Sequence, residues 1–189
     1  METEIINGKG KSYGTEFSLK KPGGRVNGRI DYTYSRTLIR TVSDFPEEII
    51  NGGEYFPANY DKPHSLNILA NLKISRRLIL NTSLFYSTGR PITYPVAKYQ
   101  LGDQVILHYS DYNQYRIPDY FRLDMGLMVT GNLKKNKLLH STFTFSLYNV
   151  TGRKNAYSVY FRSEGGNFEA YKLSIFGTII PTVSYNFRF

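Results

Sequence analysis

The stretch from residue 64 to residue 87 reads HSLNILANLKISRRLILNTSLFYS, and its pattern predicts the architecture of the chain. In its first half every second residue is apolar, and one side of an extended strand carries Leu66, Ile68, Ala70, Leu72 and Ile74. After the turn at 75–77 the alternation resumes with Leu80, Thr82, Leu84 and Tyr86. Successive side chains of a strand point to opposite faces. The stretch therefore predicts two strands that are joined by a tight turn and share an apolar face.

The same alternation recurs along the chain and predicts seven strands, over 12–20, 26–35, 65–75, 80–87, 120–130, 139–148 and 179–189. No residue on the apolar faces is charged. The opposite faces carry Glu16, Lys20, Arg29, Asp31, Lys73, Arg122, Asp124 and Arg188. One face of the predicted sheet therefore tolerates charge and the other excludes it.

The connections between these strands alternate between short and long. Tight turns are predicted at 20–25, 75–77 and 134–137, and long connections at 37–62, 89–118 and 152–171. Long alternating strands with this loop pattern are typical of outer-membrane β-barrels, because lipid offers the backbone no hydrogen bonds. A soluble antiparallel sandwich also alternates, but its strands are usually only about 5–6 residues long. We therefore expect an all-β, antiparallel transmembrane β-barrel segment.

Composition excludes several other classes. The 189 residues include no cysteine, so a disulfide framework, a thiol-ligated zinc site and a cysteine nucleophile are ruled out. The net charge of +9 invites a nucleic-acid interpretation. However, much of this charge lies at the short turns, in Lys20, Lys21, Arg25, Arg76, Arg77, Lys134, Lys135 and Lys137. A basic rim that contacts solvent or lipid headgroups is the better interpretation, and no nucleic-acid partner is expected.

Residues that could carry catalysis or bind a metal form no recognisable set. The histidines His64, His108 and His140 lack metal-ligand spacing, and no Ser/His/Asp set or phosphate-binding loop is present. The first long connection contains the acidic residues Glu47, Glu48, Glu54 and Asp61, which we expect to be solvated although they could contact a cation. The sequence thus predicts neither an enzyme nor a cofactor or metal site.

Aromatic residues crowd the second and third long connections. The second holds Tyr94, Tyr99, Tyr109, Tyr112 and Tyr115, and the third holds Tyr157, Tyr160, Phe161, Phe168 and Tyr171. Tyrosine offers amphipathic contact area at low entropic cost, so these residues suit ligand contacts. An aromatic girdle at the membrane interface is an equal alternative. As candidate ligand contacts we take Tyr94, Tyr99, Tyr109, Tyr112, Tyr115, Tyr160 and Phe161.

The chain ends in the segment PTVSYNFRF, residues 181–189, with aromatic residues at Tyr185, Phe187 and Phe189. A terminal aromatic in this register looks like the assembly signal that the barrel-assembly machinery reads. The alternative is that the segment is merely the last lipid-facing strand, and the two roles are compatible.

Six segments together resemble the C-terminal barrel portion of TonB-dependent outer-membrane receptors, especially those with a carboxypeptidase-regulatory-like domain ahead of the plug. They are GKGKSYGTEF (8–17), DYTYSRT (31–37), YSTGRPITYP (86–95), YRIPDYFRLDMGL (115–127), LYNVTGRKNAY (147–157) and PTVSYNFRF (181–189). The resemblance implies a 22-stranded barrel around a plug. It also implies uptake of a nutrient such as an iron chelate, a glycan, a peptide or cobalamin, driven through TonB.

The chain departs from the full pattern of that family, since it has no plug, no TonB-contacting segment and no secretory signal. Residues 1–189 are therefore expected to form the C-terminal part of such a barrel in the cell outer membrane, with TonB reached only through the missing plug. The resemblance places the short turns in the periplasm and the long connections outside, facing an extracellular nutrient ligand. The alternative is a small self-contained barrel acting as an adhesin or structural protein, which would need an eighth strand.

Overall fold

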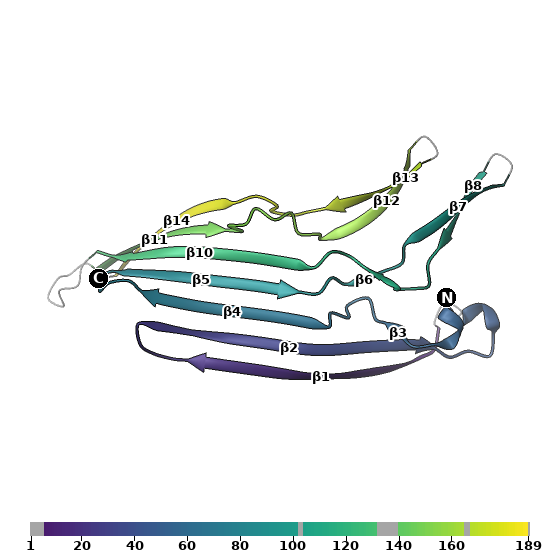
Figure 1. The fold of residues 1–189 in the computed structure, drawn as a ribbon, viewed down its shortest axis with the longest axis horizontal. Helices are drawn as coiled ribbons and strands as arrows, with labels where there is room; N and C mark the ends of the chain where they lie inside the picture. Colours follow the sequence, from purple (N-terminus) through teal and green to yellow (C-terminus); the bar gives the residue numbers. More distant parts are fainter. Residues whose placement is uncertain (1–5, 102–103, 132–139, 165–166, 189) are drawn as a thin grey trace.

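The computed structural model describes residues 6–101, 104–131, 140–164 and 167–188, and it is all-β. Seven long strands lie side by side in the order in which they occur along the chain (Figure 1). They are β1 (Gly8–Lys21), β2 (Val26–Thr41), β4 (His64–Lys73), β5 (Leu78–Ser87), β10 (Tyr120–Thr130), β11 (His140–Tyr148) and β14 (Ile180–Arg188). Within the described residues, no helix is long and apolar enough to cross a membrane.

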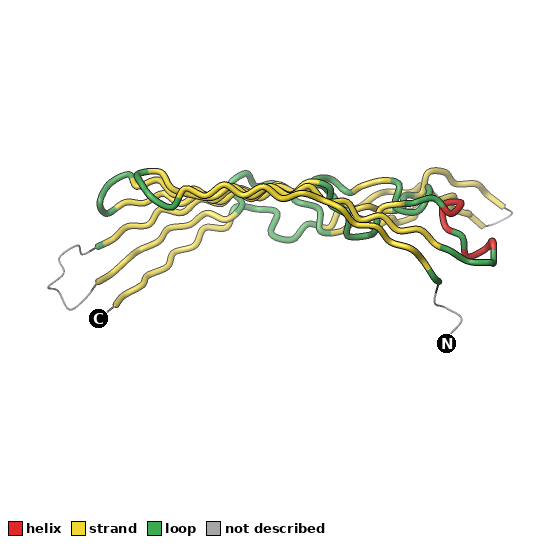
Figure 2. The backbone as a smooth tube through the Cα atoms, turned by 90° about the horizontal axis from the view of Figure 1, so that it is seen from below, coloured by secondary structure: helices red, strands yellow, loops and turns green. Residues whose placement is uncertain are grey.

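The predicted strands and their antiparallel order are confirmed, because each long strand pairs antiparallel with the next one. In the described part of the chain the sheet is a single curved layer that does not close, with β1 and β14 as its edges (Figure 2). The barrel itself therefore stays a prediction. Toward the long connections, β1 extends four residues and β2 six residues further than their alternation predicts. Alternation fades where neither face of a strand needs to be apolar.

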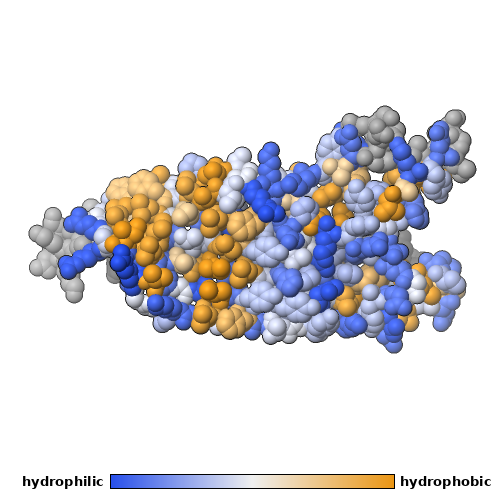
Figure 3. Space-filling model, in the orientation of Figure 1, coloured by the Kyte–Doolittle hydropathy of each residue, from blue (hydrophilic) through white to orange (hydrophobic). Residues whose placement is uncertain are grey.

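The pairing register shows which residues share a face, because directly opposite residues in antiparallel strands lie on the same side of the sheet. One row across five strands is entirely apolar and consists of Leu19, Ile30, Ile68, Leu84 and Leu123. The neighbouring row on the other side consists of Lys20, Arg29, Leu69, Ser83 and Asp124. The predicted division into an apolar face and a polar face is thus confirmed. Apolar residues gather in a band near the short-turn end of the strands (Figure 3).

An aromatic row borders the apolar band on the side of the long connections. The register aligns Phe17, Tyr32, Leu66, Tyr86 and Phe121 across five strands, and four of these five are aromatic. The sequence predicted a possible girdle only among the aromatic residues of the long connections. The aromatic residues that follow the apolar rows on the strands themselves match that description more closely.

The three long connections contain regular structure, which the sequence analysis did not predict. The first holds η2 (Pro46–Glu48), η3 (Ile50–Gly53) and β3 (Phe56–Pro57). The second holds β6 (Pro91–Ile92), β7 (Pro95–Leu101), β8 (Gln104–Tyr109) and β9 (Tyr115–Arg116), and the third holds β12 (Ser158–Glu164) and β13 (Asn167–Leu173). The hairpins β7–β8 and β12–β13 rise beyond the sheet (Figure 1). Gly102-Asp103 and Gly165-Gly166, dipeptides that favour hairpin turns, were the overlooked sequence signal.

Candidate functional site

The long-connection end of the sheet is organised by buried polar side chains, and Asn113 joins its first and second connections. Its side-chain Nδ2 donates to the carbonyl of Pro57 at 2.8 Å and to Oδ1 of Asn59 at 2.7 Å. Its backbone N–H donates to the hydroxyl of Thr93 at 3.1 Å. Asn113 has a positive φ of 59°, a conformation that asparagine tolerates better than most residues. One buried residue thus satisfies groups on two separate loops.

Asp61 is the centre of a buried charge network, which corrects the expectation that it is solvated. Its side chain is fully buried and forms ion pairs with Arg36 at 3.4 Å and with Arg116. It also accepts the backbone N–H of Thr37 at 2.7 Å, while Arg116 donates to the carbonyl of Gly89 at 2.9 Å. Two arginines therefore neutralise this carboxylate inside the fold. It is not free to bind a cation from solution.

The third connection is fixed by two further asparagines. Asn149, which is 1% exposed and has a φ of 53°, donates from Nδ2 to the carbonyls of Arg153 at 3.1 Å and Phe176 at 3.2 Å. Asn155 pairs with the backbone of Phe121, to which it donates at 2.9 Å and from which it accepts at 3.0 Å. These bonds fold the third connection over the end of β10.

Asp119, just before β10, links the second connection to the strands. It accepts the hydroxyl of Tyr86 at 2.6 Å and the backbone N–H of Gly89 at 3.0 Å, and Arg153 donates to its carbonyl at 2.9 Å. The Tyr86 hydrogen bond, supported by the Gly89 amide, lowers the pKa of the Asp119 carboxyl below its usual range. Asp119 therefore remains a carboxylate at neutral pH.

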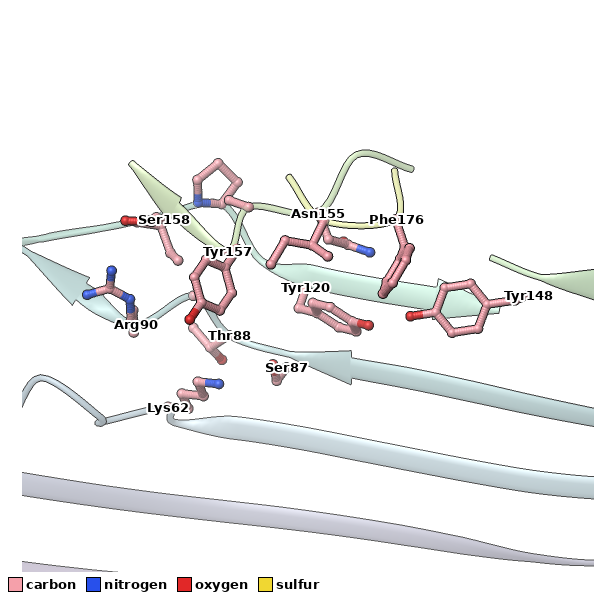
Figure 4. Close-up of a pocket in the computed structure, with 15 residues that line it drawn as sticks. Lys62, Ser87, Thr88, Arg90, Tyr120, Tyr148, Asn155, Tyr157, Ser158 and Phe176 are labelled. Carbon is pink, nitrogen blue, oxygen red and sulfur yellow. The ribbon is translucent and has the colours of Figure 1, made fainter. Parts of the chain in front are cut away.

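These elements surround a cavity of about 750 Å³. It lies on the polar side of the sheet, because Ser87 and Tyr120 are direct cross-strand neighbours on that face. Besides these two, its lining includes Lys62, Thr88, Arg90, Tyr148, Asn155, Tyr157, Ser158 and Phe176 (Figure 4). In the view of Figure 4, Arg90 and Lys62 lie toward one end, and Phe176 and Tyr148 toward the other. The volume lies in the range of about 300–1,000 Å³ that is usual for sites of small ligands.

Arg122, on β10, binds two of the tyrosines that line this cavity. Its Nη1 donates to the hydroxyl oxygens of Tyr120 at 3.1 Å and Tyr148 at 2.9 Å. Its guanidinium also lies 4.5 Å from the centre of the Tyr148 ring and 4.8 Å from that of Phe85. Asp124 pairs with Arg122 at 3.0 Å and balances its charge. The positions of both phenol groups are thus fixed by the strands rather than by the loops.

Three of the seven predicted ligand-contact residues come together. The ring of Tyr94 lies 5.6 Å from that of Tyr115 and 5.0 Å, edge to face, from that of Phe161. All three line a second, smaller cavity of about 320 Å³, which borders the larger one at Ile117 and Pro118. Its walls are mostly apolar, so these rings pack the second connection against the third.

The other four predicted residues lie apart from this group. Tyr112 packs edge to face on Phe56 at 5.4 Å. Tyr160 stacks on Tyr171 at 5.5 Å. Exposed positions on the β7–β8 hairpin carry the last two, Tyr99 and Tyr109.

None of the seven predicted ligand-contact residues is among the described residues that line the larger cavity. Sequence reasoning missed Tyr120 and Tyr148 there, although both lie on the predicted polar face at the long-connection end of their strands. That position was the signal that could have found them.

The predicted C-terminal signal lies on the sheet edge formed by β14. The side chains of Tyr185 and Phe187 are exposed there, and the Tyr185 ring lies 4.5 Å from that of Phe143 on β11. Phe189 lies outside the described residues. An exposed aromatic edge of this kind fits either role considered for the segment.

Searches against family models, curated proteins and solved structures found no match to this chain. In the part of the chain that the structure describes, no three His, Asp or Glu side chains gather in a way that could hold a metal ion. The candidate site is therefore defined by its own geometry: an aromatic and basic cavity on the polar face, framed by the long connections.

Proposed function

We propose that this chain forms part of the wall of a TonB-dependent outer-membrane receptor, and that its long connections contact a nutrient taken up from outside the cell. In this role the apolar face meets outer-membrane lipid and the polar face lines the lumen. The barrel-assembly machinery inserts the chain, and TonB acts on a plug outside the described segment. The proposed role is binding and uptake rather than catalysis.

The observation that carries this proposal is the division of the sheet into an apolar and a polar face. On β5 the apolar face runs from Leu78 to Tyr86, which is about 26 Å along the strand at roughly 3.3 Å per residue. A strand tilt of about 40° reduces this to roughly 20 Å, close to the band of about 25 Å on known barrels. An aromatic row at Phe17, Tyr32 and Tyr86 ends the band, as at a membrane interface.

A self-contained adhesin barrel is less well supported. Six successive antiparallel pairings separate β1 from β14, so these two edge strands run in the same direction. Joining them directly would create a parallel seam in an otherwise antiparallel barrel. Single-chain bacterial barrels avoid this by using even numbers of strands. The sheet is better completed by further strands of a larger barrel.

Single-cysteine labelling tests the proposal directly, because the chain contains no cysteine of its own. In intact cells, a membrane-impermeant maleimide should label Tyr99→Cys on the β7–β8 hairpin. It should label Arg76→Cys only after the outer membrane is permeabilised. Ile68→Cys should remain unlabelled, whereas its neighbour Asn67→Cys on the polar face should react. Equal labelling of Ile68→Cys and Asn67→Cys, or recovery of the chain outside the outer membrane, would overturn the proposal.

A further inference from the structure

Two aromatic residues that line the larger cavity are largely exposed to solvent. Phe176 is 64% exposed and Tyr157 is 66% exposed, and both residues line the cavity. The backbone of Phe176 also has a φ of +52°, which is strained for a bulky residue. The amide of Asn149 holds this conformation through the carbonyl of Phe176. Strained and exposed residues of this kind concentrate at binding sites.

The charge of the cavity lining is positive. Lys62 and Arg90 line it, and no acidic side chain does so among the described residues. Neither of these two cations takes part in the ion pairs of Asp31, Asp61 and Asp124, which involve Arg29, Arg36, Arg116 and Arg122. Lysine and arginine arranged in this way bind carboxylate or phosphate groups, arginine through two parallel hydrogen bonds.

Residues with hydroxyl groups complete the lining. Ser87, Thr88, Tyr157 and Ser158 each contribute one. In Figure 4 the hydroxyl of Tyr157, which comes from the third connection, points toward Thr88 at the end of β5. Hydroxyls both donate and accept hydrogen bonds, so they match a ligand that is itself rich in hydroxyls.

From these three features together we propose that the cavity binds an acidic sugar, with its carboxylate at Arg90 and Lys62 and a ring face against Tyr157 or Phe176. The apolar C–H face of a sugar ring suits the negative face of an aromatic ring. The proposal rests on the proposed receptor function and narrows its ligand to one chemical class. A neutral glycan would leave the two cations unpaired, and a catechol-type acid brings only two hydroxyl groups to a lining that offers several.

Equilibrium dialysis with tri-galacturonate tests this class, and the methyl ester of the same trisaccharide serves as a matched neutral probe. The dialysis is performed on whichever cell fraction holds the chain, and the same fraction from cells lacking the chain is the blank. Tri-galacturonate should bind at least tenfold more tightly than its ester, and raising the salt concentration should reduce this preference. Equal binding of the two probes, tighter binding of 2,3-dihydroxybenzoate, or no binding at all would overturn the proposal.

Variants locate the site. The double change K62Q and R90Q should remove the preference for the acid over the ester, whereas R76Q and R77Q at the opposite end of the strands should leave it unchanged. Asparagine tolerates a positive φ, so the variant Phe176→Asn should still fold. It should weaken the binding of both probes by about tenfold, which corresponds to roughly 1.4 kcal/mol. Unchanged binding in K62Q/R90Q would overturn the assignment to this cavity. Cell fractionation tests separately whether the chain lies in the outer membrane, as the proposed receptor function requires. Failure of the receptor proposal can therefore be distinguished from failure of the acidic-sugar proposal.

Discussion

The strand body and the long-connection end of this molecule are stabilised in different ways. In the strand body the backbone groups bond to neighbouring strands, and the side chains only have to match the medium on each face. At the long-connection end, by contrast, buried Asn113, Asn149 and Asp61 bind backbone groups that no ladder pairs. Substitutions in the first region should therefore act through polarity and face. Those in the second should act through individual hydrogen bonds.

The largest effect is expected at Asp61. Asp61→Ala leaves Arg36 and Arg116 without their shared carboxylate and the N–H of Thr37 without its acceptor. Breaking a buried ion pair from one side typically costs about 3–5 kcal/mol. Because both arginines remain partly exposed to water, we expect about 3 kcal/mol. Hydrogen exchange of the Thr37 amide measures this loss as a lower free energy of local opening.

Glu54 provides the control for this measurement, since it is an exposed carboxylate in the same connection. Glu54→Ala should change the exchange of the Thr37 amide by less than about 0.5 kcal/mol. If Asp61→Ala had an effect as small as this, the network would contribute nothing to the stability of the long-connection end.

The second prediction tests the proposal that the apolar face of the strand body meets lipid. Ile68→Arg places a charge in the middle of the apolar row and should cost about 2–4 kcal/mol near the bilayer midplane. Asn67→Arg, one residue earlier, projects from the polar face opposite Asp31 and should change stability by less than about 0.5 kcal/mol. Urea unfolding in lipid vesicles compares the two variants. Equal losses would contradict the assignment of the apolar face to lipid.

This contrast also explains what the sequence could predict. The sequence predicted correctly that Ile68 lies on the apolar face. All residues on one face of a sheet meet the same medium, so the sequence alternates with a period of two. The buried positions of Asp61 and Asn113 were not predicted. Their roles depend on contacts with Arg116 and Pro57, respectively, each more than fifty residues away in the sequence. The short pattern around each of them is that of an ordinary polar loop.

The candidate site falls between these two cases. Tyr120 and Tyr148 lie on the predicted polar face, so the alternation of their strands contained the information needed to find them. Phe176 and Lys62 reach the same cavity only through the fold of the long connections. Aromatic density alone pointed instead to Tyr94, Tyr115 and Phe161, which pack the connections against one another.

The smallest of the three effects is expected at Asn113, where two substitutions separate its two contributions. Asn113→Gly tolerates the positive φ but removes the donor to the Pro57 carbonyl, and it should cost about 1 kcal/mol. Asn113→Ala removes the donor and also places a Cβ in the left-handed region, so it should cost about 2 kcal/mol. Limited proteolysis within the first long connection, calibrated against urea, measures both losses. Equal losses for glycine and alanine would mean that the backbone conformation contributes nothing and that the hydrogen bonds alone hold this end together.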